Sequence, residues 1–154
     1  MQWRSISFHM GGFDTRLIRQ AAELGFNDIC FQTEGNNRLL LADLDRRATT
    51  ARLPDLLREL GLSATVWVHE FDERRDHLGG IACDNQALWA DLEQRYEHLI
   101  STVVPWVDRY VLTVAETTVN VDDRALLEQV VAVIDGVCQR HGKELVLRSF
   151  VHEP

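Results

Sequence analysis

Short apolar strand patterns alternate with longer amphipathic helix patterns along the whole 154-residue chain. Each strand pattern is separated from the next by enough residues for a helix, so neighbouring strands are expected to run in the same direction. The apolar runs 111–114 and 145–147 are typical of strands in a buried parallel sheet. The sequence therefore predicts an α/β fold on a parallel sheet. The expected strands are 5–10, 28–33, 64–69, 110–115 and 144–151.

Capping residues and glycines mark the expected helix ends. Asp14 is a good N-cap for a helix that reaches Leu24, and Gly25 supplies a left-handed stop. Segment 41–60 is helical in composition, but Pro54 either opens its final helix or kinks a longer one.

The later helices show similar signals. Gly61 ends the 41–60 segment, and Asp84 is the expected N-cap of a third helix. Asp122 or Asp123 is expected to cap a fourth helix, which ends at residues 141–142.

Two architectures fit this order of elements, an open doubly wound sheet and a barrel. The first strand-to-helix turn, residues 9–13, lacks the GxGxxG pattern of dinucleotide sites, and the chain has no GxxxxGK[ST] motif. A full (β/α) barrel needs about 250 residues, and four strand–helix units plus a strand fill about five-eighths of that length. We expect a parallel (β/α) barrel truncated to about strands 1–5, as one N-terminal partial barrel domain over 1–154.

Charge and cysteine content limit the partners and the location. The net charge is -8 and no dense Lys/Arg face is present, which argues against binding to nucleic acid or to an anionic membrane. Cys30, Cys83 and Cys138 form no CxxC pair, so reduced thiols are expected. The chain has no apolar run of membrane-spanning length and no signal-peptide pattern, and a cytoplasmic location is expected.

Polar residues gather where the expected strands end, the place where barrel enzymes carry out their chemistry. Period-two alternation puts Trp67 and His69 on one side of their strand, and Arg148 and His152 on one side of theirs. The orientation of the glutamates at the strand-to-loop junctions is left open by this pattern. The polar strand-end residues are His9, Gln32, Glu34, Trp67, His69, Glu70, Glu116, Arg148, His152 and Glu153.

Carboxylates around one opening suit glycoside hydrolysis, which needs a protonated acid and an ionised carboxylate. Trp67 could stack on a sugar ring, and Arg148 could hold a substrate carboxylate. The simpler interpretation is that the acids are loop residues in salt bridges with Arg74, Arg75 or Arg148. No cofactor is required by this chemistry.

A metal site is the alternative chemistry. His9, His69 and His152, together with Glu34 or Glu153, could bind Zn²⁺, Mn²⁺ or Mg²⁺. No HxH or HExxH spacing supports such a site.

Short phrases of the chain resemble known barrel enzymes. Residues 22–28 (AELGFND) and 61–70 (GLSATVWVHE) resemble barrel glycosidases, in which a helix ending in Leu-Gly leads into a strand with active-site residues. The strand ends 113–116 (TVAE) and 148–154 (RSFVHEP) look most like the catalytic barrel of the α-glucuronidase type or a carbohydrate-active relative. The helix phrase also resembles xylose-isomerase-like barrels, which bind divalent metals through Glu, Asp and His.

The glycosidase resemblance implies hydrolysis of O-glycosyl bonds, with Glu116 after strand four as the general acid and Glu70 and Glu153 assisting. In such barrels the partner carboxylate often lies on a later strand, which is absent from this sequence. We expect a carbohydrate substrate. The residues expected to bind it are His9, Gln32, Glu34, Trp67, His69, Arg148 and His152.

Two other hypotheses stay open. One is a divalent-metal-dependent sugar isomerase or hydrolase built on the histidines. The other is a half-barrel that is inactive alone and acts with a partner, either a second copy in a homodimer or the missing C-terminal half of the barrel.

Overall fold

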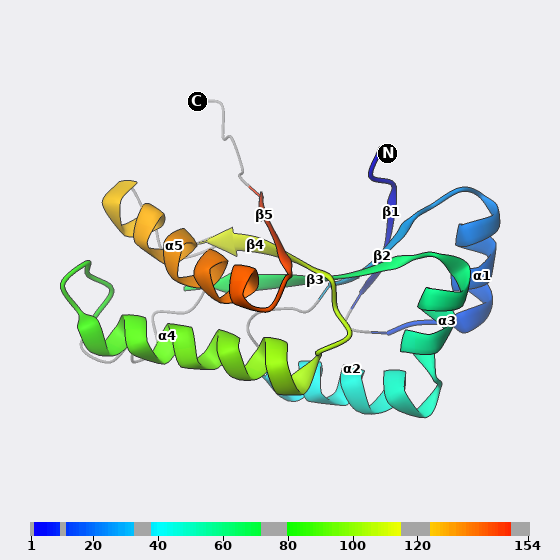
Figure 1. Cartoon of the computed structure of the whole chain (residues 1–154), viewed down its shortest axis with the longest axis horizontal. Coiled ribbons are helices and arrows are strands. Elements are labelled where there is room, and N and C mark those ends of the chain that lie inside the picture. Colours follow the sequence, from blue (N-terminus) through cyan, green and yellow to red (C-terminus); the bar gives the residue numbers. More distant parts are fainter. Residues whose placement is uncertain (1, 10–11, 33–37, 72–79, 115–123, 149–154) are drawn as a thin grey trace.

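A single five-stranded parallel sheet forms the centre of the computed structural model (Figure 1). Its strands follow one another in chain order, β1-β2-β3-β4-β5. The predicted α/β fold and its five strands are therefore confirmed. The strands are β1 Ser5–His9, β2 Asp28–Gln32, β3 Ser63–Glu70, β4 Arg109–Val114 and β5 Glu144–Arg148. The structure describes residues 2–9, 12–32, 38–71, 80–114 and 124–148.

Five α-helices connect or flank these strands, and one π-helical turn extends the fourth of them. Figure 1 shows α2 and α4 along the same side of the sheet. The helices are α1 Thr15–Glu23, α2 Arg38–Thr50, α3 Leu53–Leu60, α4 Gln86–His98 and α5 Arg124–Arg140, with the turn η1 Leu99–Val103.

All of these helices pack against one face of the sheet. Ile18 of α1, Leu44 of α2 and Ile134 of α5 belong to the same buried cluster as Ile29 and Val66 of the strands. Strands in sequential order with right-handed crossovers place each connecting helix on the same side, whereas a doubly wound sheet has helices on both. The described helices thus leave the opposite face of the sheet uncovered.

The strand register defines this opposite face. Ser7, Cys30, Thr65, Arg109 and Glu144 are successive register partners across the five strands. Since side chains alternate along a strand, register partners and every second residue share a face. We call this the polar face. Its members are Ser5, Ser7, His9, Asp28, Cys30, Gln32, Ser63, Thr65, Trp67, His69, Arg109, Val111, Thr113, Glu144, Val146 and Arg148.

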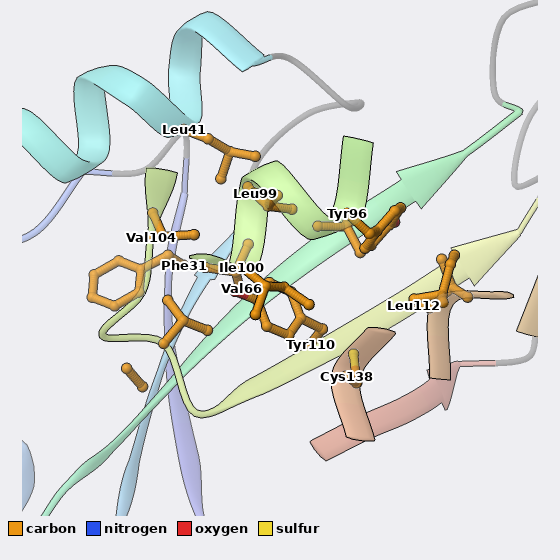
Figure 2. Close-up of a cluster of buried hydrophobic side chains, with 14 of the residues drawn as sticks. Phe31, Leu41, Val66, Tyr96, Leu99, Ile100, Val104, Tyr110, Leu112 and Cys138 are labelled. Atoms are coloured by element: carbon orange, nitrogen blue, oxygen red, sulfur yellow. The ribbon is translucent and has the colours of Figure 1, made fainter. Parts of the chain in front are cut away.

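The core on the helix face is aromatic and aliphatic. Figure 2 shows Phe31 and Val66 of the sheet close to Ile100 and Val104 at the end of the α4–η1 segment. The ring of Trp106 packs edge-on against Phe31, with the centroids 5.7 Å apart. This dense packing holds the strand ends of the polar face in fixed positions.

The predicted helix ends are largely confirmed. Asp14 caps α1 by accepting a hydrogen bond from the backbone N–H of Arg16, and Gly25 has a φ of 80°. Pro54 lies in the first turn of α3, so it opens a separate helix and does not kink a longer one. Gly61 ends α3 in the left-handed region.

The predicted cap of α4 is wrong by one residue. Asn85, not Asp84, is the N-cap, because its side-chain oxygen accepts the backbone N–H of Leu88 three positions later. The predicted caps Asp122 and Asp123 lie outside the described residues.

Two further features concern membranes and disulfides. None of the described helices is both long and apolar enough to cross a bilayer. The three cysteines are free thiols; Cys30 and Cys138 are buried and Cys83 is exposed.

Candidate functional site

Four side chains from three neighbouring strands meet at the C-terminal edge of the polar face. The indole Nε1 of Trp67 donates a hydrogen bond of 2.7 Å to Oγ1 of Thr113. The rings of Trp67 and His69 are stacked, with centroids 5.2 Å apart and planes 24° apart. The guanidinium carbon of Arg148 lies 3.9 Å from the Trp67 ring centroid. We call Trp67, His69, Thr113 and Arg148 the Trp67 cluster.

The register explains why these residues meet. His69, Thr113 and Arg148 are direct partners across β3, β4 and β5. Trp67 is two residues before His69 on the same strand and therefore shares its face. Thr113 is buried, Trp67 and His69 are partly buried, and Arg148 is exposed. The cluster thus combines an aromatic surface with polar and charged groups.

Such a combination suits the recognition of a polar ligand with apolar faces. A cation over an indole is attracted by the negative face of the ring. Because arginine has five N–H donors in one plane, its guanidinium can contact an indole and also donate to a ligand oxygen. Binding sites commonly combine aromatic walls with a few polar groups of this kind.

His9 and Gln32 extend the same edge toward β1. His9 pairs with Gln32, and Gln32 pairs with Trp67, so all three lie at one level of the polar face. His9 is exposed and Gln32 is partly buried. Alternation along the strands predicts this shared face.

Glu70 is on the opposite side of the sheet from the Trp67 cluster. It is the last residue of β3, only 2% exposed, and its Oε1 lies 3.3 Å from Nη1 of Arg95 on α4. Burial, and next the Glu70 carboxylate, raise the pKa of the adjacent Tyr96 well above its ordinary value. In the described structure, therefore, Glu70 forms an ion pair at the border of the core and does not join His9 on a common face.

The remaining predicted site residues, Glu34, Glu116, His152 and Glu153, lie outside the described residues. In the part of the chain that the structure describes, no three His, Cys, Asp or Glu side chains form a group that could hold a metal ion.

A second polar network, at the N-terminal edge of the polar face, is not indicated by the sequence patterns. Asp28 is fully buried and accepts hydrogen bonds from Ser5 Oγ at 2.5 Å, Thr65 Oγ1 at 2.7 Å and Arg109 Nη1 at 3.2 Å. Arg109 Nη2 also lies 2.7 Å from Oε2 of Glu144. We call this set the Asp28 network.

The Asp28 network and Thr113 are missed for the same reason. Each depends on which residues of different strands stand side by side, and that register is not readable from one strand at a time. The sequence signal for this network is that every described strand begins with a polar residue: Ser5, Asp28, Ser63, Arg109 and Glu144.

Cys30 lies on the polar face next to Thr65 in the register and is 7% exposed. Burial raises its pKa to about 11. Since the thiolate is the reactive form of cysteine, this thiol is a poor nucleophile at neutral pH.

Comparison with known proteins gives no family assignment: no protein-family model matches the chain, and no curated protein matches it.

Proposed function

We propose that this chain forms the first four strand–helix units and the fifth strand of a (β/α) barrel and that the polar face is the inner wall. The sequential parallel order and the packing of the described helices on one face support this architecture. In (β/α) barrels the catalytic and binding groups project from the C-terminal ends of the strands, the edge where the Trp67 cluster lies.

Exposed apolar side chains also support a larger assembly. Leu147 on β5 is 53% exposed, although it alternates with polar-face residues and belongs on the helix side. Leu24, directly after α1, is 70% exposed. Further strand–helix units beside β1 and β5, from the same protein or from a second copy, would bury these side chains.

The site belongs, in our proposal, to a carbohydrate-active enzyme that hydrolyses O-glycosyl bonds. The observation that carries this proposal is the stacking of His69 and Arg148 around the Trp67 indole. Sugars have C–H faces that pack on aromatic rings and hydroxyl oxygens that accept hydrogen bonds. The Trp67–His69 pair offers aromatic surface for the C–H faces, and the Arg148 guanidinium over the indole offers N–H donors for the hydroxyl oxygens.

Glu116 is the proposed general acid and Glu153 the second carboxylate. In hydrolysis the acid gives its proton to the leaving glycosidic oxygen, and water supplies a hydroxyl to the anomeric carbon and returns a proton to a carboxylate. Glu70 is left out of this scheme because Arg95 binds it on the helix face.

Carbohydrate binding can be tested by titrating the protein with neutral and uronic-acid oligosaccharides in calorimetry. Trp67→Ala is expected to weaken binding at least about tenfold, equal to about 1.4 kcal/mol. Trp3→Ala is the matched control, because Trp3 is another partly exposed tryptophan (45%) that contacts an arginine. The centroid of its ring lies 4.8 Å from the guanidinium carbon of Arg109, which belongs to the Asp28 network at the opposite edge of the polar face. If no oligosaccharide binds, or if both variants lose affinity equally, the proposal fails.

Hydrolysis can be tested by measuring the release of reducing ends from oligosaccharides. The protein assayed is the chain together with the further strand–helix units proposed to complete the barrel. Glu116→Gln is expected to lower turnover by about 10² to 10⁴ through loss of the proton donor. Glu128→Gln, on the exposed side of α5 beside Arg124, is the matched control and should leave turnover unchanged. Wild-type turnover in Glu116→Gln would remove this residue from the mechanism.

A further inference from the structure

We propose that Thr113 is a positioning residue that holds the Trp67 indole in the orientation needed for ligand binding. This inference rests on the proposed carbohydrate site. Thr113 itself is 1% exposed, so it acts through Trp67 and not by touching the ligand.

The geometry ties the indole to the middle of the site. Thr113 lies on β4, between its register partners His69 on β3 and Arg148 on β5. The 2.7 Å hydrogen bond to Thr113 therefore draws the Trp67 side chain from β3 toward β4. There the ring contacts both His69 and Arg148.

The hydroxyl of Thr113 is a well-fixed acceptor. A β-branched side chain has restricted rotation about its first torsion, and the β4 backbone is paired on both sides. A tryptophan ring, in contrast, can turn about two side-chain torsions, and its N–H is a donor only. Removal of the acceptor allows the ring to turn and leaves a partly buried N–H without this partner.

Movement of the indole would disturb the whole recognition surface. His69 stacks on the ring and the Arg148 guanidinium lies over it, so both depend on its position. Thr113 thus controls the relative placement of three groups from two strands through one hydrogen bond. Loss of that bond is expected to lower affinity without removing any ligand-contacting side chain.

The test compares Thr113→Val, which keeps the shape of the side chain but has no hydroxyl, with Thr113→Ser, which keeps the hydroxyl. Indole N–H resonances of ¹⁵N-labelled protein are recorded, with the Trp67 signal assigned by its absence in Trp67→Phe. In Thr113→Val we expect this signal to shift upfield and to exchange faster with water, and in Thr113→Ser to match the wild type.

Affinity is then measured with the oligosaccharide that binds the wild-type protein best. Thr113→Val is expected to weaken binding about three- to tenfold, and Thr113→Ser to stay within twofold of the wild type. Wild-type affinity in Thr113→Val, or an unmoved Trp67 signal, overturns the positioning role while the carbohydrate site stands. Failure of the wild-type protein to bind any oligosaccharide overturns both proposals.

A double-mutant cycle keeps the inference testable if Thr113→Val proves unstable. Trp67→Phe retains an aromatic ring but lacks the N–H donor. If Thr113 acts through this donor, then Thr113→Ala weakens binding in the wild-type protein but causes no further loss of affinity on the Trp67→Phe background. Additive losses in the two positions would overturn the inference.

Discussion

At the scale of single residues, the buried carboxylate of Asp28 is the group on the polar face that most needs hydrogen-bonding partners. Asp28 has no exposed surface, and three donors surround its carboxylate. A buried carboxylate is tolerated only with such partners, and removing one member of a buried ion pair leaves the other uncompensated. The Asp28 network therefore holds the starts of β1, β2, β3 and β4 together.

Asp28→Ala is expected to lower the free energy of unfolding by about 3 kcal/mol, because Arg109 loses a buried partner. Urea denaturation followed by circular dichroism measures the change. Asp43→Ala is the control, since Asp43 pairs with Arg46 and Arg47 on the exposed side of α2 and should matter little. Equal stability of the two variants would contradict a structural role for the Asp28 network.

Glu70 illustrates what single-residue patterns leave undecided. The sequence shows an acid at the end of a strand, a position that fits both a catalytic group and an ion pair. The structure shows the ion pair. Its partner Arg95 is 25 positions later in the sequence, on α4, and its Nη1 comes within 3.3 Å of Glu70 Oε1 only because α4 packs on the sheet.

At the scale of elements, the position of a glycine in a helix predicts whether its replacement by alanine stabilises or destabilises the protein. Gly61 has a φ of 67°, which L-residues other than glycine adopt at a cost, and it ends α3. Gly136 lies inside α5, and an added Cβ there would meet nothing closer than Arg140 Nη1 at 3.9 Å.

Gly61→Ala is expected to destabilise the protein by about 1 kcal/mol, through backbone strain. Gly136→Ala is expected to stabilise it by about 0.5 to 1 kcal/mol, because alanine loses less entropy in a helix. Thermal denaturation of both variants checks the opposite signs. A shift of both melting temperatures in the same direction would contradict the left-handed conformation of Gly61 or the helical conformation of Gly136.

The elements also mark the limit of prediction from the sequence. Strand positions, the Asp14 cap and the break at Pro54 follow from alternation and capping chemistry, and the structure agrees. The one-residue error at Asn85 arises because Asp84 and Asn85 are equally good caps by type, and only the bond to Leu88 distinguishes them. The hydrogen bond between Trp67 and Thr113 could not be predicted, since the position of Thr113 in the cluster depends on the register of β3, β4 and β5.

At the scale of the whole molecule, neutral acidic groups in the core make the fold sensitive to alkali. Burial raises the pKa of Cys30 to about 11 and that of Cys138 to about 12, and it also raises the pKa of Tyr110. In an unfolded chain a thiol has a pKa of about 8.5. Above that pH the unfolded state loses protons that the native state retains, so stability falls as the pH rises.

The free energy of unfolding is therefore expected to be constant below about pH 8 and to fall by about 1 to 2 kcal/mol per buried thiol by pH 10. Urea denaturation at pH 7.5, 9 and 10 measures it. A Cys30→Ala, Cys138→Ala double variant should show a shallower decline than the wild type, and Cys83→Ala should not, because Cys83 is exposed. An identical decline in all three proteins would rule out the thiols as its cause.

The proposed function depends on the polar face being the surface that binds an oligosaccharide. Hydrogen–deuterium exchange, followed by mass spectrometry with and without a bound oligosaccharide, tests this most directly. We predict slower exchange in peptides that contain the ends of β3, β4 and β5, namely residues 67–70, 111–114 and 146–148, and unchanged exchange in α1, α3 and α5. Slower exchange confined to the helices, or to the starts of the strands around Asp28, would contradict binding at the C-terminal edge of the polar face.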